Sequence, residues 1–135
     1  MDNGKPIFLY VEDDAFSQEI MKRMLTILGY PNLTIFENSH NFLDRVRALP
    51  GVPDIVFLDI QIGPMNGHQL LKLLRGDDTY KKTRIIAMTA SVMSSEVNEL
   101  RDACFDGLIG KPILKRIFPE LLQEILEGDA VWYVS

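Results

Sequence analysis

Short apolar runs alternate along the chain with segments in which apolar residues recur every three or four positions. Unbroken apolar runs of strand length are typical of strands that are buried on both faces. They occur at residues 7–11, 33–36, 55–59, 84–89 and 108–109. Helical spacing follows each of them, at residues 16–28, 39–49, 67–74, 94–103 and 113–126. Five strands alternating with five helices predict a doubly wound α/β fold, in which helices flank both faces of a parallel sheet.

Local signals predict how several helices begin. Asp13 or Asp14 is placed to cap the first helix, where a carboxylate also suits the helix dipole. The apolar residues of that helix recur at Phe16, Ile20, Met24, Ile27 and Leu28. Ser39 is the expected cap of the second helix, and the closing helix is expected to begin at Ile113.

Length and composition describe an ordinary soluble domain. The chain has 135 residues, of which 47% are hydrophobic and 24% charged. We assign residues 1–127 to one domain and residues 128–135 to a C-terminal tail, which is either a flexible end or an apolar segment that packs on the domain or on a partner. The net charge of −5 argues against a nucleic-acid surface, and no apolar stretch is long enough to cross a membrane. The single cysteine cannot form an internal disulfide, so a cytoplasmic location is expected.

Charged and hydroxyl side chains stand where the predicted strands end. Glu12 and Asp13 follow the first strand, Asp59 ends the third, Thr89 ends the fourth and Lys111 follows the fifth. The carboxyl ends of parallel strands meet at one edge of a doubly wound sheet. Carboxylates gathered there repel one another unless a cation lies between them. Oxygen ligands of this kind suit a hard divalent cation such as Mg²⁺, or Mn²⁺.

The other groups at this edge indicate what the cation would serve. The Thr89 hydroxyl can hydrogen-bond an anion, and the Lys111 ammonium supplies a compact positive charge. A carboxylate nucleophile beside a cation, a hydroxyl and an ammonium is suited to forming an aspartyl phosphate.

From about Pro6 to Leu126, the chain resembles a response-regulator receiver domain of the CheY-like superfamily. Five elements carry the resemblance in order and spacing: Glu12-Asp13, Asp59, Asn66-Gly67, Thr89-Ala90 and Lys111-Pro112. The resemblance implies a flavodoxin-like sheet with strand order 2-1-3-4-5. It also implies a stand-alone regulator that receives a phosphoryl group from a histidine kinase or a His-containing phosphotransfer protein, and that is not a turnover enzyme.

The resemblance assigns a role to each site residue. Asp59 is the phosphoacceptor, and Glu12, Asp13, Asp59 and the backbone carbonyl of Gln61 hold Mg²⁺. Lys111 pairs with the phosphoryl group, while Thr89, Ala90 and Leu108 occupy switch positions. Gln61 and Ser91 occupy positions that tune dephosphorylation. The expected outputs are binding of a downstream protein and a homodimer through the fourth helix, the last strand and the fifth helix.

Two departures and three alternatives accompany this interpretation. Gly63 stands where the family usually has proline, and Leu108 stands where it usually has an aromatic ring. A flavodoxin-like carrier is disfavoured because the loop after the first strand is acidic, and an aspartate-based phosphatase because Gln61 replaces its second aspartate. A pseudo-receiver, which would bind partners without phosphorylation, remains the alternative because of Leu108.

Overall fold

Six strands form a single sheet in the computed structural model, which describes residues 4–90 and 94–133. They are β1 (Phe8–Val11), β2 (Leu33–Phe36), β3 (Ile55–Asp59), β4 (Arg84–Thr89), β5 (Gly107–Gly110) and β6 (Val131–Tyr133). Their order across the sheet is β2-β1-β3-β4-β5-β6, and each neighbouring pair is parallel. The predicted doubly wound fold and the order of the first five strands are confirmed, and the sheet has a sixth strand that was not expected.

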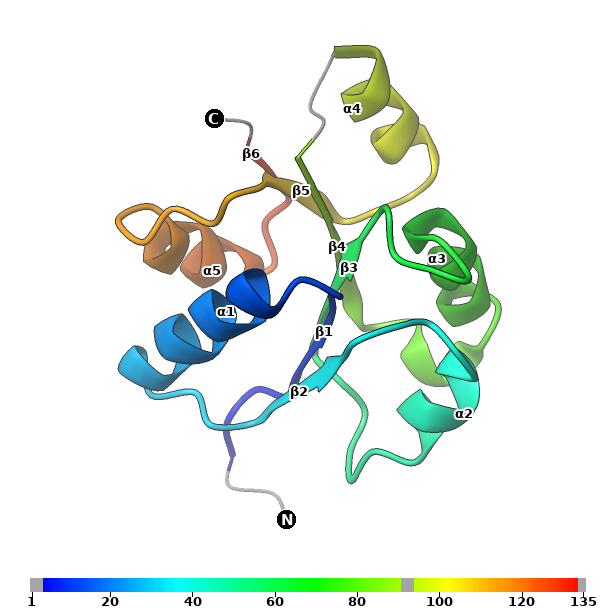
Figure 1. Cartoon of the computed structure of the whole chain (residues 1–135), viewed down its shortest axis with the longest axis horizontal. Helices are drawn as coiled ribbons and strands as arrows, with labels where there is room; N and C mark the ends of the chain where they lie inside the picture. Colours follow the sequence, from blue (N-terminus) through cyan, green and yellow to red (C-terminus); the bar gives the residue numbers. More distant parts are fainter. Residues whose placement is uncertain (1–3, 91–93, 134–135) are drawn as a thin grey trace.

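Helices cover both faces of the sheet (Figure 1). One face carries α1 (Ala15–Ile27) and α5 (Phe118–Leu126). The other carries α2 (Phe42–Arg47), α3 (Gly67–Arg75) and α4 (Ser94–Asp102). A short 3-10 helix, η1 (Asp78–Tyr80), precedes β4. The two layers produce two apolar cores, one on each side of the sheet.

The two central strands place the candidate site. Every residue of β1 and β3 is buried, and their side chains alternate between the two cores. Phe8, Tyr10 and Phe57 face α1 and α5 and pack ring against ring, with Phe57 6.3 Å from Phe8 and 6.2 Å from Tyr10 between centroids. Rigid, fully packed strands therefore deliver the acidic residues that follow them to fixed positions.

The Asn66-Gly67 pair anchors α3 against the end of β3. Asn66 accepts a hydrogen bond from the amide of Gln69 at 3.0 Å, and the Gln69 side chain accepts one from the amide of Asn66 at 2.8 Å. This reciprocal capping box satisfies two donors of the first turn. A Cβ at Gly67 would lie 2.9 Å from the Cα of Ile60, so only glycine lets the helix start so close to the strand.

The first helix buries a narrower face than its sequence indicated. Of the two predicted caps, Asp14 is the one that caps the helix, and it accepts a hydrogen bond from the amide of Ser17 at 2.8 Å. Phe16 and Ile27, in the first and last turns, are 70% and 82% exposed. The buried contacts come from the middle of the helix, at Met21, Met24 and Leu25. The apolar period therefore predicted the helix correctly, but Phe16 and Ile27 lie on the side of the helix that faces solvent.

Two expected helix starts are wrong. Ser39 does not cap α2, because its hydroxyl donates to the carbonyl of Met65 and accepts from the amide of Met65, both at 2.7 Å. The closing helix begins at Phe118 rather than at Ile113. Pro119 lies in its first turn, where a residue without an amide hydrogen leaves no intrahelical hydrogen bond unmade.

Residues 131–133 of the C-terminal tail pack on the domain as β6. Val131 pairs with Gly107 and Trp132 with Leu108 across the edge of β5. A Cβ at Gly107 would lie 2.5 Å from the Val131 carbonyl oxygen, so glycine is required for this close approach. On the α4 side, the guanidinium of Arg101 lies 4.7 Å from the centre of the Trp132 ring. Of the alternatives left open by the sequence, the structure shows packing on the domain.

Candidate functional site

Three carboxylates meet at the carboxyl ends of β1 and β3. Val11 pairs with Leu58, so Glu12 and Asp59 are the next residues along two adjacent strands. Glu12, Asp13 and Asp59 each offer an oxygen within 4.8 Å of the others. Glu12 and Asp59 are buried, whereas Asp13 is exposed at the rim. The predicted carboxylate cluster is therefore present.

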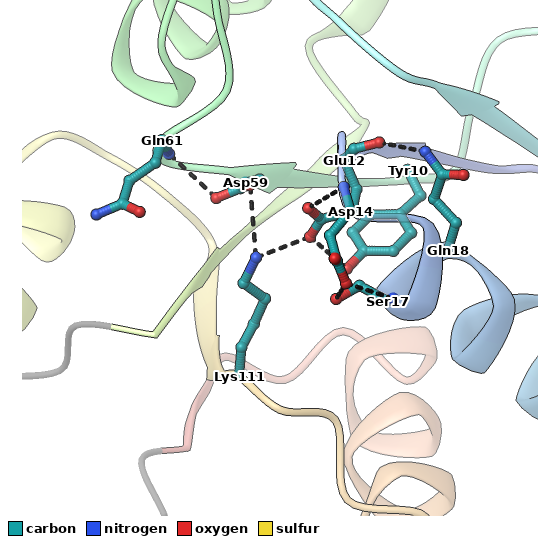
Figure 2. A network of polar contacts seen from close by, with 8 residues as sticks. All are labelled: Tyr10, Glu12, Asp14, Ser17, Gln18, Asp59, Gln61 and Lys111. Carbon is teal, nitrogen blue, oxygen red and sulfur yellow. Dashed lines mark hydrogen bonds and ion pairs between the residues drawn. The ribbon is translucent and has the colours of Figure 1, made fainter.

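Glu12 is fully buried and holds three hydrogen bonds (Figure 2). Its Oε1 accepts from the Tyr10 hydroxyl at 3.0 Å and from the Lys111 ammonium at 2.8 Å. Its Oε2 accepts from the backbone amide of Asp14 at 3.1 Å. Burial alone would raise the pKa of Glu12, but these donors, led by Lys111, outweigh burial and lower it. Glu12 is thus held as a buried carboxylate anion.

Asp59 is held less tightly than Glu12. One oxygen accepts from the backbone amide of Gln61 at 3.0 Å, and the other lies 3.4 Å from the Lys111 nitrogen. Burial raises the pKa of Asp59, and the nearby charge of Glu12 raises it further. The cluster therefore favours a cation or a second positive group near Asp59.

Lys111 joins the two buried carboxylates, and Figure 2 shows its side chain pointing at both. Burial alone would lower the pKa of Lys111, but the hydrogen bond to Glu12 and the charge of Asp59 raise it instead. Its backbone amide donates to the carbonyl of Thr89 at 2.8 Å. Thr89 is itself buried at the end of β4, so Lys111 and Thr89 are neighbours as predicted.

The remaining predicted residues occupy different settings. Ala90 is exposed, Leu108 is fully buried in β5, and the Gln61 side chain is exposed in the loop after Asp59. The role of the Gln61 carbonyl as a metal ligand stays a prediction. Ser91 lies outside the described residues. A Cβ at Gly63 would meet nothing within 4 Å, so packing does not require glycine where the family usually has proline.

Sequence reasoning missed two groups that hold the site. Tyr10 precedes Glu12 by two residues, a spacing that places both side chains on the same face of a strand, and this signal could have been read. Gln18 of α1 donates to the backbone carbonyl of Glu12 at 2.6 Å, a contact that no local pattern indicates.

The donor set fits a hard divalent cation. Ligands on opposite sides of Mg²⁺ are about 4.2 Å apart, because each Mg–O bond is about 2.1 Å. The three carboxylates lie within 4.8 Å of one another, so small side-chain movements would bring them to that spacing. All three are oxygen donors, which suits Mg²⁺ or Mn²⁺.

Comparison with known proteins places this geometry in context. The sequence model of the response regulator receiver domain matches residues 8–125. DivK, a polar-differentiation response regulator of Brucella anthropi, is 29% identical over 122 residues, which cover 90% of this chain and 96% of DivK. The osmosensing histidine protein kinase SLN1 of Saccharomyces cerevisiae is 29% identical over 119 residues, which cover 86% of this chain and 10% of the kinase.

Solved structures agree with the fold. The chemotaxis response regulator CheY4 of Vibrio cholerae superposes with a TM-score of 0.79 at 20% identity, covering 90% of this chain and 98% of that one. At this identity the likeness concerns the fold alone. Among residues 4–90 and 94–133, no helix combines the length and apolar character needed to cross a bilayer.

Proposed function

Because the chain belongs to the family of response regulator receiver domains, we propose that Asp59 accepts a phosphoryl group from a phosphohistidine donor. Receiver domains work in two-component signalling as regulators, and they interact with histidine kinases and downstream effectors. The observation that carries the proposal is the position of Asp59, which is buried within the carboxylate cluster and lies beside the Lys111 ammonium. A cytoplasmic location goes with the proposal and rests on the single cysteine.

Glu12, Asp13 and Asp59, with the backbone carbonyl of Gln61, would hold Mg²⁺ or Mn²⁺. When bound, the cation neutralises charge on the carboxylates and on the phosphoryl oxygens. Glu12 contributes a side chain whose orientation is already fixed by three donors. Asp13 is exposed and can turn toward the cation. A fixed Glu12 below the cation and an exposed Asp13 at the rim would leave the site open to a phosphoryl donor that approaches from solvent.

The chemistry then falls to Asp59. Its carboxylate oxygen attacks phosphorus in line, the bond between phosphorus and the donor histidine nitrogen breaks, and the electron pair returns to the imidazole. Lys111 lies 3.4 Å from Asp59 and can reach a phosphoryl oxygen on it with little movement. The hydroxyl of Thr89 would donate to another phosphoryl oxygen. Both donors stabilise negative charge that develops during transfer.

Conformational switching would begin at Thr89 and Ala90. The backbone amide of Lys111 donates a hydrogen bond to the Thr89 carbonyl, so movement of one residue would displace the other. The segment after Ala90 leads into α4, and β6 flanks β5 on that side. All four residues of β5 are buried and β6 covers its edge, so the partner-binding or homodimer surface expected on α4, β5 and α5 would instead consist of α4, β6 and α5. Phosphorylation would shift a two-state equilibrium of this surface.

Intact mass after incubation with acetyl phosphate and Mg²⁺ tests the proposal. The wild-type chain should gain one phosphoryl group, an Asp59→Asn variant should gain none, and an Asp129→Asn variant, which changes an exposed carboxylate of the tail, should behave as wild type. The pseudo-receiver alternative is favoured by the fully buried Leu108, which offers no ring to report the switch. No mass gain in the wild type, with a control receiver modified in parallel, would contradict the proposal and favour that alternative.

A further inference from the structure

The Tyr10 side chain contacts the Glu12 carboxylate directly, and the proposed function does not explain its role. It lies in β1 with no exposed surface, and its ring packs edge-on against Phe57 at 6.2 Å and 81°. Its hydroxyl points along the strand toward the site and donates to Glu12 at 3.0 Å (Figure 2). Phenylalanine would fill the same space, so the hydroxyl is the only part that packing does not require.

Counting the acceptor positions of Glu12 shows what the hydroxyl does. A carboxylate has about four lone-pair directions. Oε1 receives two donors, the Tyr10 hydroxyl and Lys111, and Oε2 receives one, the amide of Asp14. One direction on Oε2 is therefore left for a cation or its water. The two donors on Oε1 determine which way this remaining direction points.

We propose that Tyr10 is a positioning residue for the cation site, which it serves by fixing the Glu12 carboxylate. The inference rests on the proposed function, in which Lys111 leaves Glu12 to pair with the phosphoryl group. Once Lys111 has moved, the Tyr10 hydroxyl is the donor that remains on Oε1. A buried carboxylate that lost both donors would be free to rotate and costly to keep charged. Tyr10 thus holds the ligand in place throughout the transfer.

Removal of the hydroxyl alone tests this role. Mg²⁺ binding is measured by calorimetry on the unphosphorylated wild type, on Tyr10→Phe and on Tyr30→Phe, a control that removes a hydroxyl from the edge of the same core. Loss of a group that orients a metal ligand lowers affinity about 10–100-fold. We expect the Kd of Tyr10→Phe to rise by at least about 10-fold, with Tyr30→Phe unchanged. An unchanged Kd for Tyr10→Phe would overturn the proposal.

Kinetics separate positioning from a general structural effect. The phosphorylation rate with acetyl phosphate is measured against Mg²⁺ concentration. A positioning role raises the Mg²⁺ concentration needed for half-maximal rate and leaves the maximal rate close to wild type. A merely structural role lowers the melting temperature and leaves the Mg²⁺ dependence unchanged, which would also overturn the proposal. In a Glu12→Gln background, Tyr10→Phe should change Mg²⁺ affinity no further, because its effect passes through the carboxylate.

Two outcomes distinguish the inference from the proposed function. If the wild-type chain binds no Mg²⁺, the cation site itself is refuted. If the wild type binds Mg²⁺ and Tyr10→Phe binds it equally tightly, only the role of Tyr10 is refuted. If Tyr10→Phe does not fold, fluorotyrosine is incorporated into the wild-type chain, which has four tyrosines. The Tyr10 fluorine resonance, assigned by replacing the other three in turn, should shift with Mg²⁺ at the calorimetric Kd. No shift would overturn the proposal.

Discussion

Replacing Asp59, the proposed phosphoacceptor, by its amide should make the metal-free protein more stable. In Asp59→Asn at pH 7 without divalent cations, we expect the free energy of unfolding to rise by about 1–2 kcal/mol, as often found when buried charge is removed. The amide oxygen can still accept from the amide of Gln61, and Lys111 keeps Glu12 as its partner. No buried charge is left alone by the substitution.

The magnitude follows from three charge interactions and one burial cost. At an effective dielectric constant of about 20, Glu12, which lies within 4.8 Å of Asp59, repels it by at least about 3.5 kcal/mol. Lys111 at 3.4 Å attracts it by about 5 kcal/mol. Exposed Asp13 adds a repulsion that water screens to about 1 kcal/mol. These interactions nearly cancel, so the cost of burying the Asp59 charge decides the sign.

The gain should depend on pH in a defined direction. Burial raises the folded-state pKa of Asp59 above its ordinary value of 3.8. Below pH 3.8 the carboxyl is neutral in both the folded and unfolded states, so the wild type carries no penalty there. As pH rises through the folded-state pKa, the penalty develops and the advantage of Asp59→Asn appears. The difference should therefore be present at pH 7 and vanish toward pH 3.8.

Urea unfolding with EDTA and with Mg²⁺ measures the effect, with Asp129→Asn as the control for loss of an exposed charge. At tenfold over its Kd, Mg²⁺ should stabilise the wild type by about 1.4 kcal/mol. It should stabilise Asp59→Asn less, because the variant lacks one anionic ligand. A variant that is less stable than wild type at pH 7 in EDTA would refute the reasoning, since attraction to Lys111 would then outweigh burial.

Three further substitutions test other parts of the structure by urea unfolding. Lys111→Met should lower the free energy of unfolding by about 3 kcal/mol, because it removes the cation partner of fully buried Glu12; an unchanged stability would contradict that pairing. Gly107→Ala should cost about 1–3 kcal/mol and raise amide exchange in β6, since its Cβ would collide with the Val131 carbonyl; protected β6 amides would contradict the tight approach. Asn66→Ala should cost about 1 kcal/mol through loss of the α3 cap, and no loss would contradict the capping box.

Sequence periodicity predicted the sheet because central parallel strands are buried on both faces and leave unbroken apolar runs. It failed where few residues carry the signal. The strand β6 has three residues, and what fixes it is the close approach of Val131 to Gly107, a contact between distant parts of the chain. The residue type of Ser39 predicts a helix cap, but its hydroxyl is hydrogen-bonded to the backbone of Met65 instead. Long-range competition of this kind is invisible to local patterns.

The site was predictable as a set of residues because strand ends converge in this fold. What the sequence could not predict was which carboxylate of the cluster has its pKa lowered and which has it raised. Glu12 and Asp59 are both buried carboxylates, yet the pKa of Glu12 is lowered and that of Asp59 is raised. The difference arises because Glu12 receives three donors, one of which is Lys111 at a closer distance than Lys111 keeps from Asp59. Such an asymmetry depends on tenths of an ångström.

This asymmetry gives Lys111 a switching role under the proposed function. In the unphosphorylated chain its ammonium is closer to Glu12, at 2.8 Å, than to Asp59, at 3.4 Å. Phosphorylation replaces the single negative charge of the Asp59 carboxylate by nearly two on the phosphoryl group, a net gain of about one, which reverses that preference. Glu12 can release Lys111 because it retains two donors, from Tyr10 and the amide of Asp14. Since the Lys111 amide is bonded to Thr89, this exchange of partners would reach the end of β4 without any aromatic ring at position 108.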